Sequence, residues 1–222
     1  MVELSPFKKD ELSEGMHLMN MEIEAGNSWP FLECYESLDD YCNYFHSHNS
    51  YAVRFVDQEK HGKDILGCFY IKPNFPGRCS HICNGGFITN RKYRNMGIGT
   101  FMAKSYLRMA KELGYRASFF NLVFDTNSVS IALWKKLGFR KLATIPRAFD
   151  QKNTKSLVDA HQFYYDFYGV ENRSEEARKQ TEWMENEWDR VFNRNSDSRD
   201  DYQHQHQHQH QHQHQHQHQH QH

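Results

Sequence analysis

The chain has 222 residues, and its 27 Lys and Arg against 28 Asp and Glu give a formal net charge of −1. Because the basic residues are not gathered on one segment, we do not expect a nucleic acid as a partner. No apolar run approaches the length of a membrane span, and the first residues do not begin a signal peptide. We therefore expect a cytoplasmic protein that does not contact a membrane.

The end of the chain has low sequence complexity. Residues 203–222 alternate Gln and His and hold ten of the sixteen histidines, so they cannot build a core. They are a genomic repeat or a tag and would bind divalent metals only adventitiously. Residues 171–194 before them are charged and poorly apolar. We predict a single folded domain over residues 1–170, a peripheral helix over 171–194 and a disordered tail over 195–222.

The cysteines indicate a reducing environment and no metal site. They are scattered through apolar segments, as Cys34, Cys42, Cys68, Cys79 and Cys83. An odd number of cysteines of this kind is typical of reduced core thiols in a cytoplasmic protein. Cys79 and Cys83, with His81 between them, resemble half of a zinc site, but a structural site needs a second ligand pair. We predict no metal.

The first part of the chain predicts two helices and a hairpin. Residues 5–6, Ser-Pro, have the form of a helix cap and first turn, apolar residues then recur at steps of three and four, and Gly26 ends the pattern. A shorter helix is predicted over residues 37–45. Residues 51–56 and 65–71 are strand-like and joined by a polar turn, which predicts an antiparallel hairpin.

The third strand leads into a basic, glycine-containing loop. This strand covers residues 79–90, and its glycines at 85–86 predict either a β-bulge or a close backbone approach. Residues 94–99, Arg-x-x-Gly-x-Gly, follow at the joint with a long helix over 97–113. Unpaired amides at a helix start, beside glycines and an arginine, suit a pyrophosphate.

Two other kinds of phosphate-binding loop do not fit these residues. A Walker loop requires Gly-Lys-Ser/Thr, which is absent. A dinucleotide fingerprint requires a third small residue where Met102 stands, and an acidic residue downstream of a second parallel strand. Neither fits, so the loop alone leaves a choice between a pyrophosphate site and a glycine-containing helix start that binds nothing.

The remainder of the chain predicts a crossover connection. Residues 119–124 form a nearly all-apolar strand interrupted by Asn121, residues 125–128 cap a further helix, and strands follow at 139–145 and 157–167. A strand, helix, strand sequence implies a parallel pair, whereas the hairpin implies antiparallel pairing. The predicted fold is therefore a mixed α/β sheet.

Two segments carry a resemblance to a known family. A strand leads into Arg-x-x-Gly-x-Gly at 94–99 and a long helix, and residues 127–139 read Asn-x-x-x-x-Ala-Leu-Trp-Lys-Lys-Leu-Gly-Phe. In these segments the chain resembles the GCN5-related N-acetyltransferase (GNAT) superfamily. The resemblance implies a mixed, mostly antiparallel central sheet in a single domain, with a parallel, splayed strand pair that holds acetyl-CoA, the cosubstrate.

Further segments resemble one group within that superfamily, the yeast azetidine-2-carboxylate N-acetyltransferases, which acetylate the ring nitrogen of proline analogues and so detoxify them. These segments are residues 21–26, 67–74, 78–81, 83–84 and 120–127. The similarity extends over about residues 7–168. It implies transfer of acetyl from acetyl-CoA to the amine of azetidine-2-carboxylate or a related imino acid, by direct attack in a ternary complex.

The superfamily resemblance also implies which residues contact the coenzyme. Backbone groups of two strand residues would hold the pantetheine and polarise the thioester carbonyl, and amides of the basic loop would take the pyrophosphate. The residues so assigned are Phe87, Ile88, Arg94, Asn95, Met96, Gly97, Ile98, Gly99, Thr100 and Asn127.

Two asparagines stand in strands where a core favours apolar residues. A buried amide needs a partner, so Asn84 and Asn121 either pair with backbone or face the coenzyme cleft, where their oxygens would accept hydrogen bonds from the attacking amine. Because asparagine cannot be a general base, the proton would leave through water. The resemblance to the azetidine-2-carboxylate group implies that Asn84, Asn121 and Asn127 act in substrate binding or catalysis.

The sequence departs from the superfamily at the residue expected to protonate the leaving thiolate. The usual tyrosine is replaced by Trp134, whose indole nitrogen cannot serve as an acid. A thiol with an ordinary pKa near 8.5 leaves readily without one, and Asn127 could donate a hydrogen bond to it. Glu24, Glu33 and Asp125 are the residual candidates for a general base.

A cyclic amino-acid substrate also carries a carboxylate. Arg78 or Lys72, beside the proline-containing loop, would clamp it, and we assign Arg78 to substrate binding. The apolar side chains that could wall a small ring are Met19, Phe31, Phe45 and Tyr70.

Two rival functions remain open. One is a GNAT enzyme that acetylates another amine, such as a polyamine or a protein N-terminus, although the acidic residues do not cluster as a polyamine site would require. The other is a non-catalytic acetyl-CoA-binding module, in which Trp134 in place of the usual tyrosine reflects the loss of catalytic activity. The expected partners are a small-molecule amine and acetyl-CoA, and the sequence leaves the oligomeric state open, a homodimer included.

Overall fold

The computed structural model describes residues 1–152, 154 and 156–169, which all belong to one compact unit. The predicted helix over 171–194 and the predicted tail over 195–222 lie outside the described residues. Within the described part of the chain, no helix is both long and apolar enough to cross a membrane.

One sheet of seven strands forms the centre of the unit, in the order β1-β2-β3-β4-β5-β7-β6. The pair β4–β5 is parallel, and the other neighbouring strands are antiparallel. This confirms the predicted mixed sheet. The strands are β1 Val2–Pro6, β2 Asn49–Phe55, β3 Gly67–Pro73, β4 Ile82–Thr89, β5 Ala117–Phe124, β6 Arg140–Phe149 and β7 Val158–Asp166.

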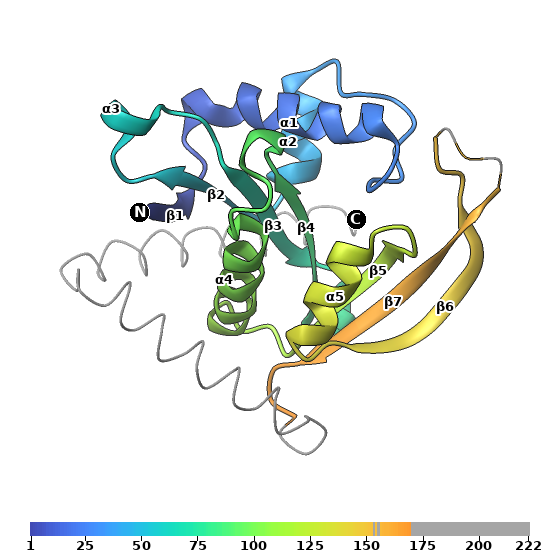
Figure 1. Ribbon diagram of the computed structural model, residues 1–222. Helices are drawn as coiled ribbons and strands as arrows, with labels where there is room; N and C mark the ends of the chain where they lie inside the picture. Colours follow the sequence, from blue (N-terminus) through green and yellow to red (C-terminus); the bar gives the residue numbers. More distant parts are fainter. Residues whose placement is uncertain (153, 155, 170–222) are drawn as a thin grey trace, which may run out of the picture. The chain divides into compact units, whose positions relative to one another are not determined.

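Helices cover both faces of the sheet. Figure 1 shows α1 and α2 together at the top of the view, with α4 and α5 below them. The helices are α1 Leu12–Ala25, α2 Leu38–Phe45, α3 Gln58–His61, α4 Ile98–Glu112 and α5 Ser128–Lys136. Short 3₁₀ turns are η1 Lys9–Glu11, η2 Gly77–Cys79 and η3 Arg91–Tyr93.

Two adjacent glycines of β4 show which helices lie on which face. A Cβ on Gly85 would lie 2.6 Å from the Tyr106 ring of α4, whereas a Cβ on Gly86 would lie 2.4 Å from Trp29. Trp29 belongs to the core cluster that α1 and α2 build. The pairing of β3 with β4 is unbroken through both glycines. The predicted close backbone approach is therefore confirmed, and the alternative of a bulge is wrong.

The crossover helix α5 lies on the same face as α4. Its buried Trp134 packs against Phe87, Phe120 and Phe139, with ring centroids 4.5–5.3 Å apart. Phe87 also packs against Tyr106 of α4. A continuous aromatic core therefore joins α4 and α5 beneath the two parallel strands.

Capping residues end the helices as local chemistry dictates. Ser37 caps α2 by accepting a hydrogen bond from the Asp40 amide at 3.2 Å, and Asn127 caps α5 through the Ser130 amide at 3.1 Å. Gly26, at the end of α1, has φ of +64°, a left-handed conformation that favours glycine. These predicted helix ends are confirmed.

The prediction that Ser5 and Pro6 begin a helix is wrong. Both lie in β1, an edge strand that pairs with β2, and helical structure begins only at Lys9. Proline is tolerated on an edge strand because its missing amide is not needed there. The local Ser-Pro signal loses to a tertiary contact, since the Ser5 hydroxyl and the Pro6 carbonyl both accept hydrogen bonds from Arg54.

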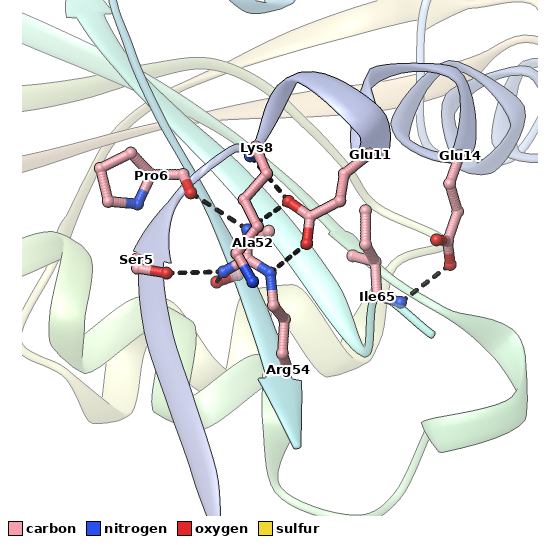
Figure 2. A network of polar contacts seen from close by, with 8 residues as sticks. All are labelled: Ser5, Pro6, Lys8, Glu11, Glu14, Ala52, Arg54 and Ile65. Carbon is pink, nitrogen blue, oxygen red and sulfur yellow. Dashed lines mark hydrogen bonds and ion pairs between the residues drawn. The ribbon is translucent and has the colours of Figure 1, made fainter. Parts of the chain in front are cut away.

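A buried ion pair fastens this first strand to the domain. Figure 2 shows the Arg54 side chain, fully buried in β2, meeting the Glu11 carboxylate through Nε and Nη2. The remaining guanidinium N–H groups donate to Ser5 at 2.7 Å, to the Pro6 carbonyl at 3.0 Å and to the Ala52 carbonyl at 3.2 Å. All five N–H groups of the guanidinium thus have a partner, as a buried cation requires.

The pKa of Glu11 reflects this environment. Burial alone would raise the pKa, but hydrogen bonds from Arg54 and from the Lys8 amide, with the charge of Arg54, together lower it below 4.5. A carboxyl with a lowered pKa in the folded state contributes stability above its unfolded pKa. That contribution is lost as the pH falls below about 4.5 and through the folded value.

Replacing Glu11 by Gln should destabilise the fold by about 3–5 kcal/mol, because Arg54 would remain buried without its counter-charge. Urea unfolding at neutral pH measures this loss. The matched control is Glu112→Gln, which removes a surface partner of Arg108 and should cost under about 1 kcal/mol. Equal losses for the two variants would contradict the role given to the buried pair.

Candidate active site

The parallel strands β4 and β5 separate soon after they meet. Their pairing consists of Ile82 opposite Ala117 and Cys83 opposite Ser118, with no further pair. We call the end of this pairing the vertex. Beyond the vertex, the backbone groups on the facing edges of β4 and β5 have no partner strand. Such groups are available to a ligand. The separation is the splayed pair that the resemblance implies.

A cavity of about 960 Å³ opens beside the splayed strands. It is bounded by the end of β4, the basic loop, the start of α4, the first turns of α5 and the end of α1. The residues assigned to coenzyme binding line it, with the exception of Met96, whose side chain is exposed. Those in the lining are Phe87, Ile88, Arg94, Asn95, Gly97, Ile98, Gly99, Thr100 and Asn127.

The start of α4 presents free amides to this cavity. Gly97 is the N-terminal capping residue, with φ of +81°, and the first amide that bonds back to it belongs to Phe101 at 2.9 Å. The amides of Ile98, Gly99 and Thr100 therefore have no helical acceptor. A Cβ on Gly99 would meet only Thr89, at 3.6 Å, so packing within the protein does not require glycine there. The missing side chain leaves this part of the cavity lining open.

A carboxylate that the sequence analysis did not single out organises the basic side of the cavity. Glu22 of α1 is buried and accepts hydrogen bonds from Arg91 at 3.0 Å, from Arg94 at 2.7 Å and from Ser28 at 3.2 Å. The two arginine side chains stay 41% and 49% exposed. Glu22 thus balances one of two positive charges and holds both guanidinium groups beside the helix start, where an anion would gain from them.

Trp134 does not face the cavity. It is 5% exposed and enclosed by the aromatic core beneath β4 and β5, while its neighbours Ala132, Leu133 and Lys136 line the cavity. The position that carries the superfamily's usual tyrosine acid is therefore occupied by a packing residue. A leaving thiolate would have to depart unassisted or be protonated by another group.

Asn84 lies at the vertex of the splayed strands, on the face covered by α1 and α2. It is directly opposite Lys72 of β3, so the two side chains share a face of the sheet. The Lys72 side chain extends over the ring of Tyr44 from α2, which identifies that face. The Asn84 oxygen accepts a hydrogen bond from the Gly85 amide at 2.8 Å. Its NH₂ group is not used in that bond.

Asn121 has a partner that neither prediction considered. It forms a reciprocal amide pair with Asn74, in which Asn74 donates at 3.1 Å and Asn121 donates at 2.6 Å. Asn74 follows the end of β3 and Asn121 lies in β5 beyond the last pair with β4, so the contact links the end of β3 to β5. Each amide keeps one N–H and one lone pair for another group. Neither Asn84 nor Asn121 is among the residues that line the 960 Å³ cavity.

The other candidate residues are more dispersed. Arg78 lies in the exposed turn η2. Glu24 and Glu33 are exposed, and none of the three proposed bases lines the cavity. Asp125 instead contacts His161, with its Oδ1 2.9 Å from Nε2, beside the turn that carries Asn127.

The proposed apolar wall is only partly available to a substrate. Met19 and Phe45 are fully buried within the core between the sheet and α1–α2, which makes them packing residues. Phe31 is half-buried and meets Tyr44 edge to face, with ring centroids 5.1 Å apart. Tyr70 is 3% exposed, and its hydroxyl lies 3.1 Å from that of Tyr44.

Free amides, two arginines and a splayed strand pair around one cavity define a protein that binds a phosphate-containing coenzyme. Comparison with known proteins agrees with this class. The model of the acetyltransferase (GNAT) family matches residues 18–139. The chain is 38% identical over 176 residues to the N-acetyltransferase aca1 of Schizosaccharomyces pombe, a match that covers 74% of this chain and 84% of that protein.

Solved structures share the fold. A GCN5-related N-acetyltransferase from Kribbella flavida has a TM-score of 0.68 at 22% identity, over 74% of this chain and 97% of that chain. The acetyltransferase yncA from Salmonella typhimurium, solved with acetyl-CoA, has a TM-score of 0.66 at 10% identity, over 75% of this chain and 94% of that chain.

The chain belongs to the GNAT family of acetyltransferases and is an acyltransferase that uses acetyl-CoA.

Two further residues contribute to the site beside the expected ones. Glu22 and Asn74 both lie in segments that resemble the azetidine-2-carboxylate group, at 21–26 and 67–74. That resemblance was their only signal, because a single carboxylate or amide indicates nothing without its partners.

Replacing Arg94 by Gln should weaken binding of coenzyme A about tenfold, because one charge-assisted hydrogen bond to the pyrophosphate is lost from a half-exposed site. Calorimetric titration at low salt measures the dissociation constant. Arg116→Gln, at an exposed position just before β5, is the control and should bind as the wild type does. Unchanged affinity in the Arg94 variant would show that the anion lies elsewhere.

Proposed function

We propose that this enzyme acetylates the ring nitrogen of a small imino acid such as azetidine-2-carboxylate. The proposal is supported by the position of Asn84, directly after the last residue of β4 that pairs with β5, and by that of Asn121, which lies on β5 beyond the pairing. Both residues match positions to which the resemblance assigns substrate binding or catalysis. The curated relative from S. pombe is itself named an N-acetyltransferase.

The chemistry of these two side chains suits a secondary amine. A protonated ring nitrogen has two N–H groups, and each asparagine oxygen keeps a lone pair after its internal hydrogen bond. Two neutral acceptors can orient the nitrogen without holding its proton as tightly as a carboxylate would. One proton then leaves to water. The lone pair that it frees is directed towards the coenzyme between the separated strands.

The transfer itself needs few protein groups. The nitrogen attacks the thioester carbon, the carbon–sulfur bond breaks, and the thiolate departs. The nitrogen releases its second proton to water as the acetyl group becomes a tertiary amide. The backbone amide of Phe87, a residue that lines the cavity, points away from the β3–β4 ladder and would polarise the carbonyl. Buried Trp134 cannot protonate the thiolate, so its departure relies on the ordinary acidity of a thiol.

The acceptor face also favours a small substrate over a peptide. Trp29 contacts Gly86 directly, and the rings of Phe31, Tyr44 and Tyr70 surround it. Trp29 and Tyr70 are buried core residues, so only the half-buried rings of Phe31 and Tyr44 are available to a substrate on the face of β4 that carries Asn84. A compact ring fits such a surface better than an extended chain does.

Thiol release from acetyl-CoA should be fastest with azetidine-2-carboxylate when it is compared in parallel with L-proline, spermidine and a peptide N-terminus. Mass spectrometry of the product then locates the acetyl group on the ring nitrogen. Faster turnover of spermidine or the peptide would assign the enzyme to another amine. Tight coenzyme binding without turnover of any acceptor would make the chain a binding module.

Asn84→Ala and Asn121→Ala should each lower kcat/KM for the imino acid by about 10- to 100-fold, because each removes one hydrogen bond to a charged group. The KM for acetyl-CoA should stay within about twofold. Asn43→Ala, at an exposed position of α2, serves as a control that should leave both constants unchanged. Full activity in either variant would refute the role given to that asparagine.

A further inference from the structure

Lys72 occupies an unusual position for a lysine. It lies near the end of β3, directly opposite Asn84, and its side chain is half-buried on the face covered by α1 and α2. Residues paired across neighbouring strands have their Cβ atoms about 4.5–5.5 Å apart. Lys72 therefore stands beside the asparagine that, in the proposed function, contacts the substrate nitrogen.

In the part of the chain that the structure describes, this ammonium group has no counter-charge. Its Nζ donates to the Tyr44 carbonyl at 3.2 Å and lies 3.7 Å from the centroid of the Tyr44 ring and 4.3 Å from that of Tyr70. Among the residues that the structure describes, no carboxylate contacts it. One of its three N–H groups is therefore bonded, and two can serve a ligand.

The neighbouring titratable groups do not supply the missing charge. Burial raises the pKa of Tyr35, to about 12, and also raises the pKa of Tyr44 and of Tyr70. These phenols therefore remain neutral at physiological pH. Burial also lowers the pKa of Lys72 to about 8, because the charged form is disfavoured at a half-buried position without an anion. An anionic ligand would remove that cost.

We propose that Lys72 binds the carboxylate of the acceptor, so that the enzyme selects α-imino or α-amino acids over simple amines. This inference rests on the proposed function, because it takes the substrate nitrogen to lie at Asn84 and Asn121. In an α-imino acid the carboxylate is attached to the carbon beside the nitrogen. The two binding groups must then be adjacent, as Lys72 and Asn84 are.

Arg78 is the competing cation. It lies in η2, exposed to solvent, and its charge is therefore screened and strongly hydrated. A half-buried cation interacts more strongly with a carboxylate than an exposed one does. The placement of the two side chains thus favours Lys72 over the residue that the sequence suggested.

The test compares initial rates for azetidine-2-carboxylate and for its carboxamide, which keeps the ring nitrogen and lacks the negative charge. In Lys72→Met, kcat/KM for the acid should fall about 10- to 100-fold, mainly through KM, while the value for the carboxamide changes less than about threefold. Lys72→Arg should retain part of the preference for the acid. Lys63→Met, at an exposed position before β3, should behave as the wild type.

Two outcomes would overturn the inference. One is a Lys72→Met variant with a normal melting temperature that still prefers the acid as the wild type does. The other is loss of the preference in Arg78→Gln with Lys72 intact, which would assign the carboxylate to Arg78. If Lys72→Met fails to fold, the wild type and Lys72→Arg decide, and equal rates for acid and carboxamide in the wild type would refute the inference.

Binding measurements separate this inference from the proposed function. Calorimetry with azetidine-2-carboxylate and the coenzyme A complex reports on the carboxylate site without requiring turnover. Binding to the wild type but not to Lys72→Met, in the absence of acetyl transfer, would support Lys72 and refute the proposed reaction. Turnover of acid and carboxamide at equal rates would support the reaction and refute Lys72.

Discussion

The parting of β4 from β5 is the constraint on which the rest of the site depends. Two residue pairs join the strands, and beyond them each has backbone groups without a strand partner. Unpaired backbone groups are costly unless a ligand or water satisfies them. The aromatic core below, where Trp134 packs against Phe87 of β4 and Phe120 of β5, contacts both strands. A coenzyme between them would complete the sheet that the protein leaves open.

The two sides of this opening have different chemistry. At the start of α4, free amides and two arginines, held by Glu22 from the end of α1, form a surface for phosphate. On the face of the sheet covered by α1 and α2, the half-buried Lys72 lies over the rings of Tyr44 and Tyr70 and opposite Asn84. The division suits a reaction in which an anionic coenzyme and a small acceptor approach from opposite faces and meet at the vertex.

Local signals predicted the fold well because they act within a few residues. The capping of α5 by Asn127 and the left-handed Gly97 at the start of α4 each follow from neighbouring chemistry. The first strand could not be predicted from neighbouring residues, because it depends on a contact with Arg54, some fifty residues away. Likewise, the Asn74–Asn121 pair joins positions 47 residues apart. The sequence predicted a role for Asn84 and Asn121, but not that Asn121 is paired with Asn74.

The central claim is that an imino acid binds at the vertex with its nitrogen between Asn84 and Asn121. A crystal structure of the enzyme with coenzyme A and azetidine-2-carboxylate tests it most directly. We predict that the ring nitrogen lies within hydrogen-bonding distance of both asparagine oxygens and faces the coenzyme sulfur. An imino acid bound on the α4 face, or away from both asparagines, would contradict the account.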